Sequence, residues 1–119
     1  IDTMQSLDCP VITVGEGVVA SMAAVILACG DHRQVYRHTQ VLIHQLMGGT
    51  GMAQQTDIEI VAQHTAAMRA ELDELLAEHG NLSAQEFHEL TERDCWCNAK
   101  RALELGLVDE VITSSKKAL

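Results

Sequence analysis

The sequence has few basic residues, and its longest mostly apolar run is short. Eight Lys and Arg stand against 17 Asp and Glu, so the net charge at pH 7 is −9. A phosphate-binding surface needs clustered Lys and Arg, which argues against a nucleic-acid partner. The longest mostly apolar run, residues 18–29, has 12 residues, whereas a membrane span needs about 20. We therefore expect neither a nucleic-acid partner nor a membrane span.

The chain also lacks a signal-peptide pattern, internal repeats, linkers and a phosphate-binding Gly-rich Lys motif. Its four cysteines do not suggest a disulfide framework, since Cys29 lies in an apolar run where a free thiol acts as a small hydrophobe. The 119 residues predict a single domain, residues 1–119. A cytoplasmic location is favoured.

Strand and helix patterns alternate along the chain. Strands are expected at residues 11–14, 34–37, 40–44 and 107–113, and helices at 20–29, 56–79, from Ser83, and 98–106, where Gly106 ends the last one. "MGGTG" (47–51) predicts a loop. This alternation predicts an α/β layered fold with a mainly parallel sheet.

The helix at 56–79 is the longest expected element, about 35 Å at ~1.5 Å per residue. Its predicted apolar stripe contains Ile58, Val61, Met68, Leu72 and Leu75, with Ile60 and Leu76 off the stripe. So long a helix exceeds what a 119-residue core can cover. We expect part of it to pack on another chain.

Ser21 is the one hydroxyl in "GVVASMAAVILACG" (17–30), where a strand passes into a helix. Unpaired amides and the helix dipole favour developing negative charge at a helix N-terminus. The amides of Ser21 and Met22 could therefore stabilise an oxyanion on a substrate that Ser21 attacks. This stretch alone favours the other interpretation, in which Ser21 is only an N-cap.

His44 is the best-placed of six histidines to act as a base. It ends the strand "VLIH" before a Gly-containing loop, where ligands gather in parallel α/β sheets. His64, His79 and His88 are expected to be solvated on helix faces. Asp94, followed by an expected buried turn at Cys95-Trp96, is the candidate acid that would fix the tautomer of His44.

Six segments in this order resemble the ClpP family of serine endopeptidases, from Asp2 to Thr113: "DTMQ", "VASMAAVILACG", "VLIHQLMGG", "TDIEI", "TERD" and "ALELGLVDEVI". The resemblance implies Ser21 as nucleophile, His44 as general base and Asp94 as the acid that orients it. It also implies Met22 as an oxyanion donor. No cofactor and no metal are implied.

The resemblance further implies a crotonase-like α/β subunit in a homo-oligomer of two stacked seven-membered rings. The long helix matches the family's handle, and Glu92 and Arg93 match its ring-to-ring contact pair. Gln45, Gly48 and Gly49 would flank the substrate cleft. The implied partners are a polypeptide substrate and an AAA+ Clp unfoldase.

The chain departs from the family pattern at Glu16, Leu46, Cys95, Cys97 and Lys100. The family's N-terminal Gly-Gly oxyanion segment and axial loops have no counterpart in these residues. The expectation is therefore a domain that lacks its N-terminal part, the C-terminal two-thirds of a subunit.

Three alternatives stay open. The chain could be a non-catalytic ring subunit or inactive fragment, or a crotonase-fold enzyme acting on an acyl-CoA thioester. Cys95-x-Cys97 could also bind a metal together with a histidine, although this spacing is a weak signal alone.

Overall fold

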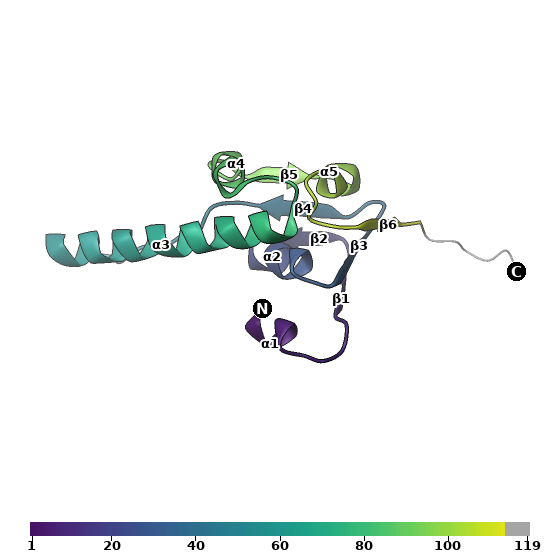
Figure 1. The fold of residues 1–119 in the computed structure, drawn as a ribbon. Coiled ribbons are helices and arrows are strands. Elements are labelled where there is room, and N and C mark those ends of the chain that lie inside the picture. The colour runs from purple at the N-terminus through teal and green to yellow at the C-terminus, as the bar shows by residue number, and fades with distance from the viewer. Residues whose placement is uncertain (114–119) are drawn as a thin grey trace, which may run out of the picture.

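The computed structural model describes residues 1–113. Figure 1 shows an α/β arrangement with one helix that extends far beyond the body. The helices are α1 (Asp2–Gln5), α2 (Met22–Ala28), α3 (Gln55–His79), α4 (Ala84–Leu90) and α5 (Ala99–Glu104). The strands are β1 (Ile12–Gly15), β2 (Val18–Ala20), β3 (His32–Tyr36), β4 (Gln40–Ile43), β5 (Cys95–Cys97) and β6 (Glu110–Ile112).

The strands form two three-stranded sheets, ordered β1-β3-β6 and β2-β4-β5, rather than the single sheet that the sequence predicts. Three of the four strand pairings are parallel, and only β4 and β5 run antiparallel. The α/β class and the mainly parallel pairing are therefore confirmed. Because β4 is the central strand of the second sheet, it has β2 on one side and β5 on the other.

Helix α2 packs against both sheets and against α3, so it forms the centre of the core. Its small and aliphatic residues allow this close approach, and Ala24 and Ala28 are fully buried. Phe87 of α4 and Leu105 and Leu107 near α5 complete the core. Burying apolar surface of this kind supplies the main driving force for folding.

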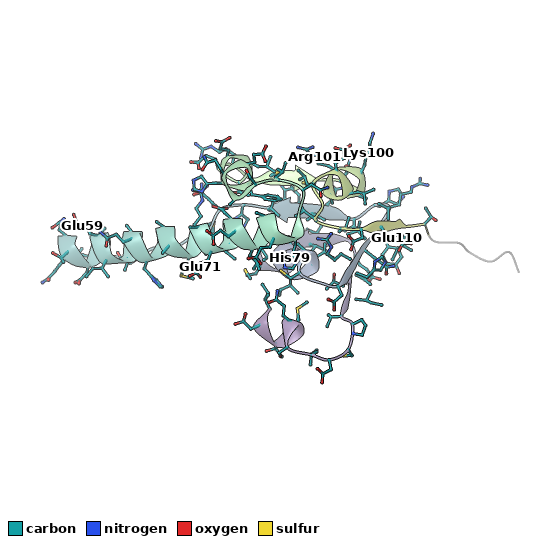
Figure 2. The ribbon with its side chains drawn as sticks, viewed as in Figure 1. Glu59, Glu71, His79, Lys100, Arg101 and Glu110 are labelled. Atoms are coloured by element: carbon teal, nitrogen blue, oxygen red, sulfur yellow. The ribbon has the colours of Figure 1, made fainter. Side chains whose placement is uncertain are left out.

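Helix α3 confirms the predicted long element, and Figure 1 shows its first half reaching past the rest of the molecule. In Figure 2, Glu59 lies near the free end, whereas His79 lies at the end against the body. The predicted apolar stripe and the buried face of α3 coincide only in part, which agrees with a helix longer than its own core can cover. Ile58 and Met68 are exposed, whereas Leu76, which lies off the stripe, is buried. Within residues 1–113, the α3 residues that pack against the hydrophobic core lie in its C-terminal half.

Two three-residue strands, β2 and β5, lie outside the strand ranges that the sequence predicts. β2 precedes the expected helix at 20–29 and overlaps it only at Ala20, whereas β5 occupies the expected buried turn at Cys95-Trp96. Trp96 is 58% exposed, so that turn prediction is wrong. By contrast, the helix expected from Ser83 is confirmed as α4, which begins with a capping box between Ser83 and Glu86. Gly106, with φ +71°, ends α5 as expected.

None of the helices in residues 1–113 is long and apolar enough to cross a membrane.

Candidate active site

The strand registers bring Ser21, His44 and Asp94 to one end of the β2-β4-β5 sheet. Ala20 of β2 lies beside Leu42, and Ile43 lies opposite Cys95 of β5. Ser21 and His44 directly follow their strands, and Asp94 directly precedes β5. The antiparallel register therefore continues to a position where Asp94 lies opposite His44. Three residues far apart in sequence thus meet around the end of the central strand.

Ser21 occupies the N-cap position of α2 but does not cap it. Its backbone has φ 61° and ψ −129°, and it is the only non-glycine residue with positive φ among residues 1–113. Its side chain makes no cap hydrogen bond. Ser83 provides an internal comparison, because at the N-cap of α4 it has φ −70° and ψ 164° and its side chain accepts from the amide of Glu86. The purely capping interpretation of Ser21 is therefore wrong.

The unusual backbone of Ser21 has an energetic cost. Non-glycine residues in such regions carry strain of about 1–3 kcal/mol, which persists at functional sites. A sharp, strained strand-to-helix turn is also the geometry that exposes a nucleophilic serine in α/β enzymes. Ser21 lies at such a turn, between β2 and α2, and is exposed.

We expect Ser21→Gly to raise the free energy of unfolding by about 1 kcal/mol, because glycine relieves strain at positive φ at a smaller entropic cost. Urea unfolding would measure this change. Ser83→Gly is the matched control, and it should lower stability by a few tenths of a kcal/mol through loss of the cap. Destabilisation by Ser21→Gly would show that Ser21 is not strained.

Ser21 and His44 line one cavity of about 240 Å³. Its other lining residues are mostly apolar and come from α2, β4, the segment after β4, and α3; they include Val25, Ile43, Leu46, Met47, Leu72 and Leu76. Gln45, Arg69, Asp73 and Thr91 add polar groups. An apolar cavity with a few polar groups is the usual form of a small binding site.

His44 and Asp94 line a second, open groove between the segment after β4 and the segment before β5. No hydrogen bond joins them within residues 1–113. Instead, Nδ1 of His44 donates to the backbone oxygen of Gln45 at 2.6 Å. Because a carbonyl only accepts, the Nδ1 atom carries a proton in this contact, and a neutral ring with this tautomer accepts a proton at Nε2. The structure thus brings Asp94 to the groove without a direct contact.

The amides near Ser21 differ in their availability as oxyanion donors. The Ser21 amide donates to the backbone oxygen of Leu42 at 3.0 Å. This hydrogen bond makes the Ser21 amide unavailable, so the expectation that it stabilises an oxyanion is wrong. The Met22 amide is at the first position of α2, where an amide has no partner within its own helix.

The three residues expected to flank the substrate cleft do not all lie in the same cavity. Gln45 lines the Ser21 cavity, whereas Gly48 and Gly49 line a different groove along the first half of α3. The structure therefore brings only Gln45 to Ser21, although the two grooves share Gln45, Leu46 and Arg69.

Arg69 was missed in the sequence because it appears as an ordinary helix-surface cation. Its guanidinium donates to Oε1 of Gln45 at 2.9 Å, to the backbone oxygen of His88 and to Oε2 of Glu92, both at 3.0 Å. The hydrogen bond and charge of Arg69 lower the pKa of the Glu92 carboxyl below its usual value. Arg69 thereby ties α3 and α4 to the residue that holds the His44 ring.

Two of the histidines that were expected to be solvated, His79 and His88, are partly buried. Nδ1 of His88 contacts the buried carboxylate of Asp73 at 2.7 Å, and Asp73 lines the Ser21 cavity. His79 is half-buried, and its Nε2 is a buried atom without a hydrogen-bond partner. Only His64 of these three is exposed as expected.

Residues 1–113 contain no group of three or more His, Cys, Asp or Glu that could hold a metal ion. Cys95 and Cys97 lie close together, but a third ligand is missing within that range. The metal alternative for Cys95-x-Cys97 therefore has no support from the geometry.

A family model described as Clp protease matches residues 1–115. The chain belongs to the Clp protease family. It is 40% identical over 118 residues to an ATP-dependent Clp protease proteolytic subunit of Streptococcus sanguinis, covering 97% of this chain and 60% of that protein. The corresponding subunit 2 of Streptomyces coelicolor is 42% identical over 117 residues, covering 97% of this chain and 54% of that protein. The chain thus spans about three-fifths of the length of the relatives it matches.

Proposed function

We propose that the chain carries the catalytic residues of a Clp-type serine endopeptidase, with polypeptides as substrates. Ser21 is the nucleophile, His44 the general base and Asp94 the acid that orients His44. The single observation that carries this proposal is the strained, exposed Ser21 turn, which shares a cavity with His44. Membership of the Clp protease family supports the same assignment.

In the proposed reaction, Nε2 of His44 takes the proton of the Ser21 hydroxyl as Oγ attacks the peptide carbonyl. The Met22 amide donates to the oxyanion that forms. The protonated ring then gives its proton to the leaving amine, and water releases the acyl group by the reverse sequence. Asp94 stabilises the imidazolium, and this requires Nδ1 of His44 to turn from the Gln45 carbonyl to Asp94.

The proposal includes an assembly. We place the subunit in a crotonase-like fold within a homo-oligomeric double heptameric ring that receives substrate from an AAA+ unfoldase. The exposed first half of α3, with Ile58 and Ile60 on its surface, supports a handle role in contact with the opposite ring. Glu92 and Arg93 are both exposed, which supports a role in ring-to-ring contact; within the subunit, Oε2 of Glu92 also accepts from Arg69. The free thiols support a cytoplasmic location.

The substrate cleft in this proposal includes Gln45 and the Gly48–Gly49 segment. The Gln45 amide donates to the backbone oxygen of Thr91, and its own carbonyl accepts from His44. Residues 46–50 have no strand partner within residues 1–113, so their backbone can pair with an extended peptide. Met47 is 81% exposed on this segment, which leaves an apolar side chain next to the cavity.

A fluorophosphonate serine probe followed by intact mass tests the proposal. We expect one adduct on the wild-type chain and none on Ser21→Ala, because the probe needs an activated serine and an oxyanion donor. Ser83→Ala is the matched control, since it removes the other helix N-cap serine and should keep the adduct. An adduct that survives Ser21→Ala would overturn the assignment.

A non-catalytic ring subunit is the second candidate. It is favoured by one observation, the Nδ1 hydrogen bond of His44 to Gln45 in place of Asp94. A ring-sized particle in solution that never reacts with the serine probe would favour this candidate. The acyl-CoA alternative gains no support from the family match.

A further inference from the structure

Cys95 and Cys97 form a close pair of thiols beside the proposed site. As residues i and i+2 of β5, they lie on the same face of the strand, and Trp96 points to the opposite face. Their Sγ atoms are 3.7 Å apart. The other two cysteines, Cys9 and Cys29, lie elsewhere in the fold, in the segment before β1 and after α2.

The two thiols differ in their access to solvent. Cys97 is fully buried, whereas Cys95 is half-buried and lines the inner side of the strand end next to Asp94. Burial, together with the neighbouring Cys95, raises the pKa of the Cys97 thiol to about 12. Cys97 is therefore protonated and shielded, and of these two thiols Cys95 is the one that can meet an oxidant from solution.

We infer that Cys95 and Cys97 are a redox-active dithiol that a peroxide converts to an intrachain disulfide. The Cys95 sulfur attacks a peroxide oxygen, the O–O bond breaks, and a sulfenic acid and water form. The Cys97 sulfur then attacks the Cys95 sulfur and expels hydroxide, which takes the Cys97 proton and leaves as water. With hydrogen peroxide, two thiols and one peroxide give one disulfide and two waters, and an external thiol reverses the reaction.

Closing this disulfide changes the geometry of β5. The Sγ atoms must move from 3.7 Å to about 2.05 Å. In an extended strand, residues i and i+2 have Cα atoms about 6.7 Å apart, whereas disulfides prefer about 5.5–6 Å. The strand must therefore shorten by about 1 Å. β5 has only three residues paired with β4, so this contraction strains the whole pairing.

The contraction also moves the residue that the proposed function needs. Cys95 pairs with Ile43, and the adjacent Asp94 lies opposite His44 in the same register. Oxidation would therefore shift Asp94 away from His44 and slow hydrolysis, a consequence that rests on the proposed function. The reduced dithiol is the form that allows Asp94 to reach His44.

Peptide mapping of the full chain tests the disulfide without any activity. Trypsin cleaves after Arg93 and Lys100, so residues 94–100 form one peptide that contains both cysteines and no other. After peroxide and alkylation, we expect this peptide to be about 2 Da lighter than the reduced form and unalkylated. Cys95→Ser and Cys97→Ser should each abolish this species, whereas Cys9→Ser should keep it. Two alkylated thiols, or sulfinic acid on Cys95 beside a free Cys97, would overturn the inference.

Two further readouts test the coupling to the site. Amide hydrogen exchange in residues 94–97 should become at least about tenfold faster on oxidation and should recover with reductant, because the β4–β5 pairing is strained. Unchanged exchange in the oxidised chain would contradict the coupling. Peptide hydrolysis should fall in parallel in the wild type and stay constant in Cys97→Ser. Hydrolysis absent in both redox states would count against the proposed function, while the peptide mass would still decide the dithiol.

Discussion

Ser21→Ala is expected to lower the rate of peptide hydrolysis by about 10⁶-fold, and His44→Ala by a similar factor, because each removes a group that bonds to or exchanges protons with the reacting atoms. Asp94→Asn should lower it by about 10⁴-fold, since an asparagine favours the wrong tautomer of the histidine. Steady-state kinetics with a fluorogenic peptide would measure all three changes.

The combined variants give the sharper result. Residues that act as one unit are not additive, so Ser21→Ala with Asp94→Asn should be no slower than Ser21→Ala alone. Ser83→Ala and His38→Ala are matched controls, because both residues lie outside the cavity of Ser21. Additive losses in the double variant would show that Asp94 acts independently of Ser21.

The magnitude at Asp94 also distinguishes two arrangements of His44. In this structure the Gln45 carbonyl already accepts from Nδ1 and fixes the tautomer. If that contact persists during the reaction, Asp94→Asn would cost less than about tenfold. Such a small loss would reduce the proposed triad to a Ser21–His44 pair.

Asp109→Ala is expected to lower the free energy of unfolding by about 2–3 kcal/mol. Arg33 is 8% exposed, and its guanidinium donates to both Asp109 carboxylate oxygens at 2.7 and 3.0 Å. Removing one partner of a fully buried pair costs about 3–5 kcal/mol, and the partial exposure of Asp109 reduces this figure. Urea unfolding would measure the loss. Glu104→Ala is the control, because Arg101 and Glu104 form an exposed pair at 3.4 Å that should contribute about 0–0.5 kcal/mol.

The same ion pair predicts a pH dependence. The side-chain hydrogen bond from Arg33 lowers the pKa of the Asp109 carboxyl. The stabilisation is therefore complete above the unfolded-state pKa of about 3.9, and it is lost as the pH falls through the lower folded-state pKa. Asp109→Asn should remove this part of the acid dependence. An acid-unfolding profile identical to that of the wild type would contradict the prediction.

Local signals predicted most of the elements correctly. The helix starts at Ser83 and near Asn98, the glycine that ends α5, and the periodicity of α3 depend on neighbouring residues alone, so they can be predicted from the sequence. The three-residue strands β2 and β5 depend on pairing with β4, whose partner residues lie 22 positions from those of β2 and 52 to 56 positions from those of β5. The residues next to each strand carry no information about a partner that far away, so neither strand was predicted.

The residues of the candidate site also fall into those that local sequence patterns predict and those that they do not. Ser21 and His44 could be predicted because each directly follows an apolar strand pattern, Ser21 where a helix begins and His44 where a loop begins. The role of Arg69 depends on three partners from different elements, none of them at helical spacing from it. The hydrogen bond of His44 to its own neighbour could not be predicted either, since it depends on how the segment after β4 turns.

The register of β4 and β5 also sets which changes this part of the chain can tolerate over evolutionary time. Side chains alternate along a strand, so one inserted or deleted residue between α4 and β5 would put Arg93 or Cys95, instead of Asp94, opposite His44. Substitutions within β5 leave this alignment intact. Among related chains, the length of this short stretch should therefore vary less than its composition.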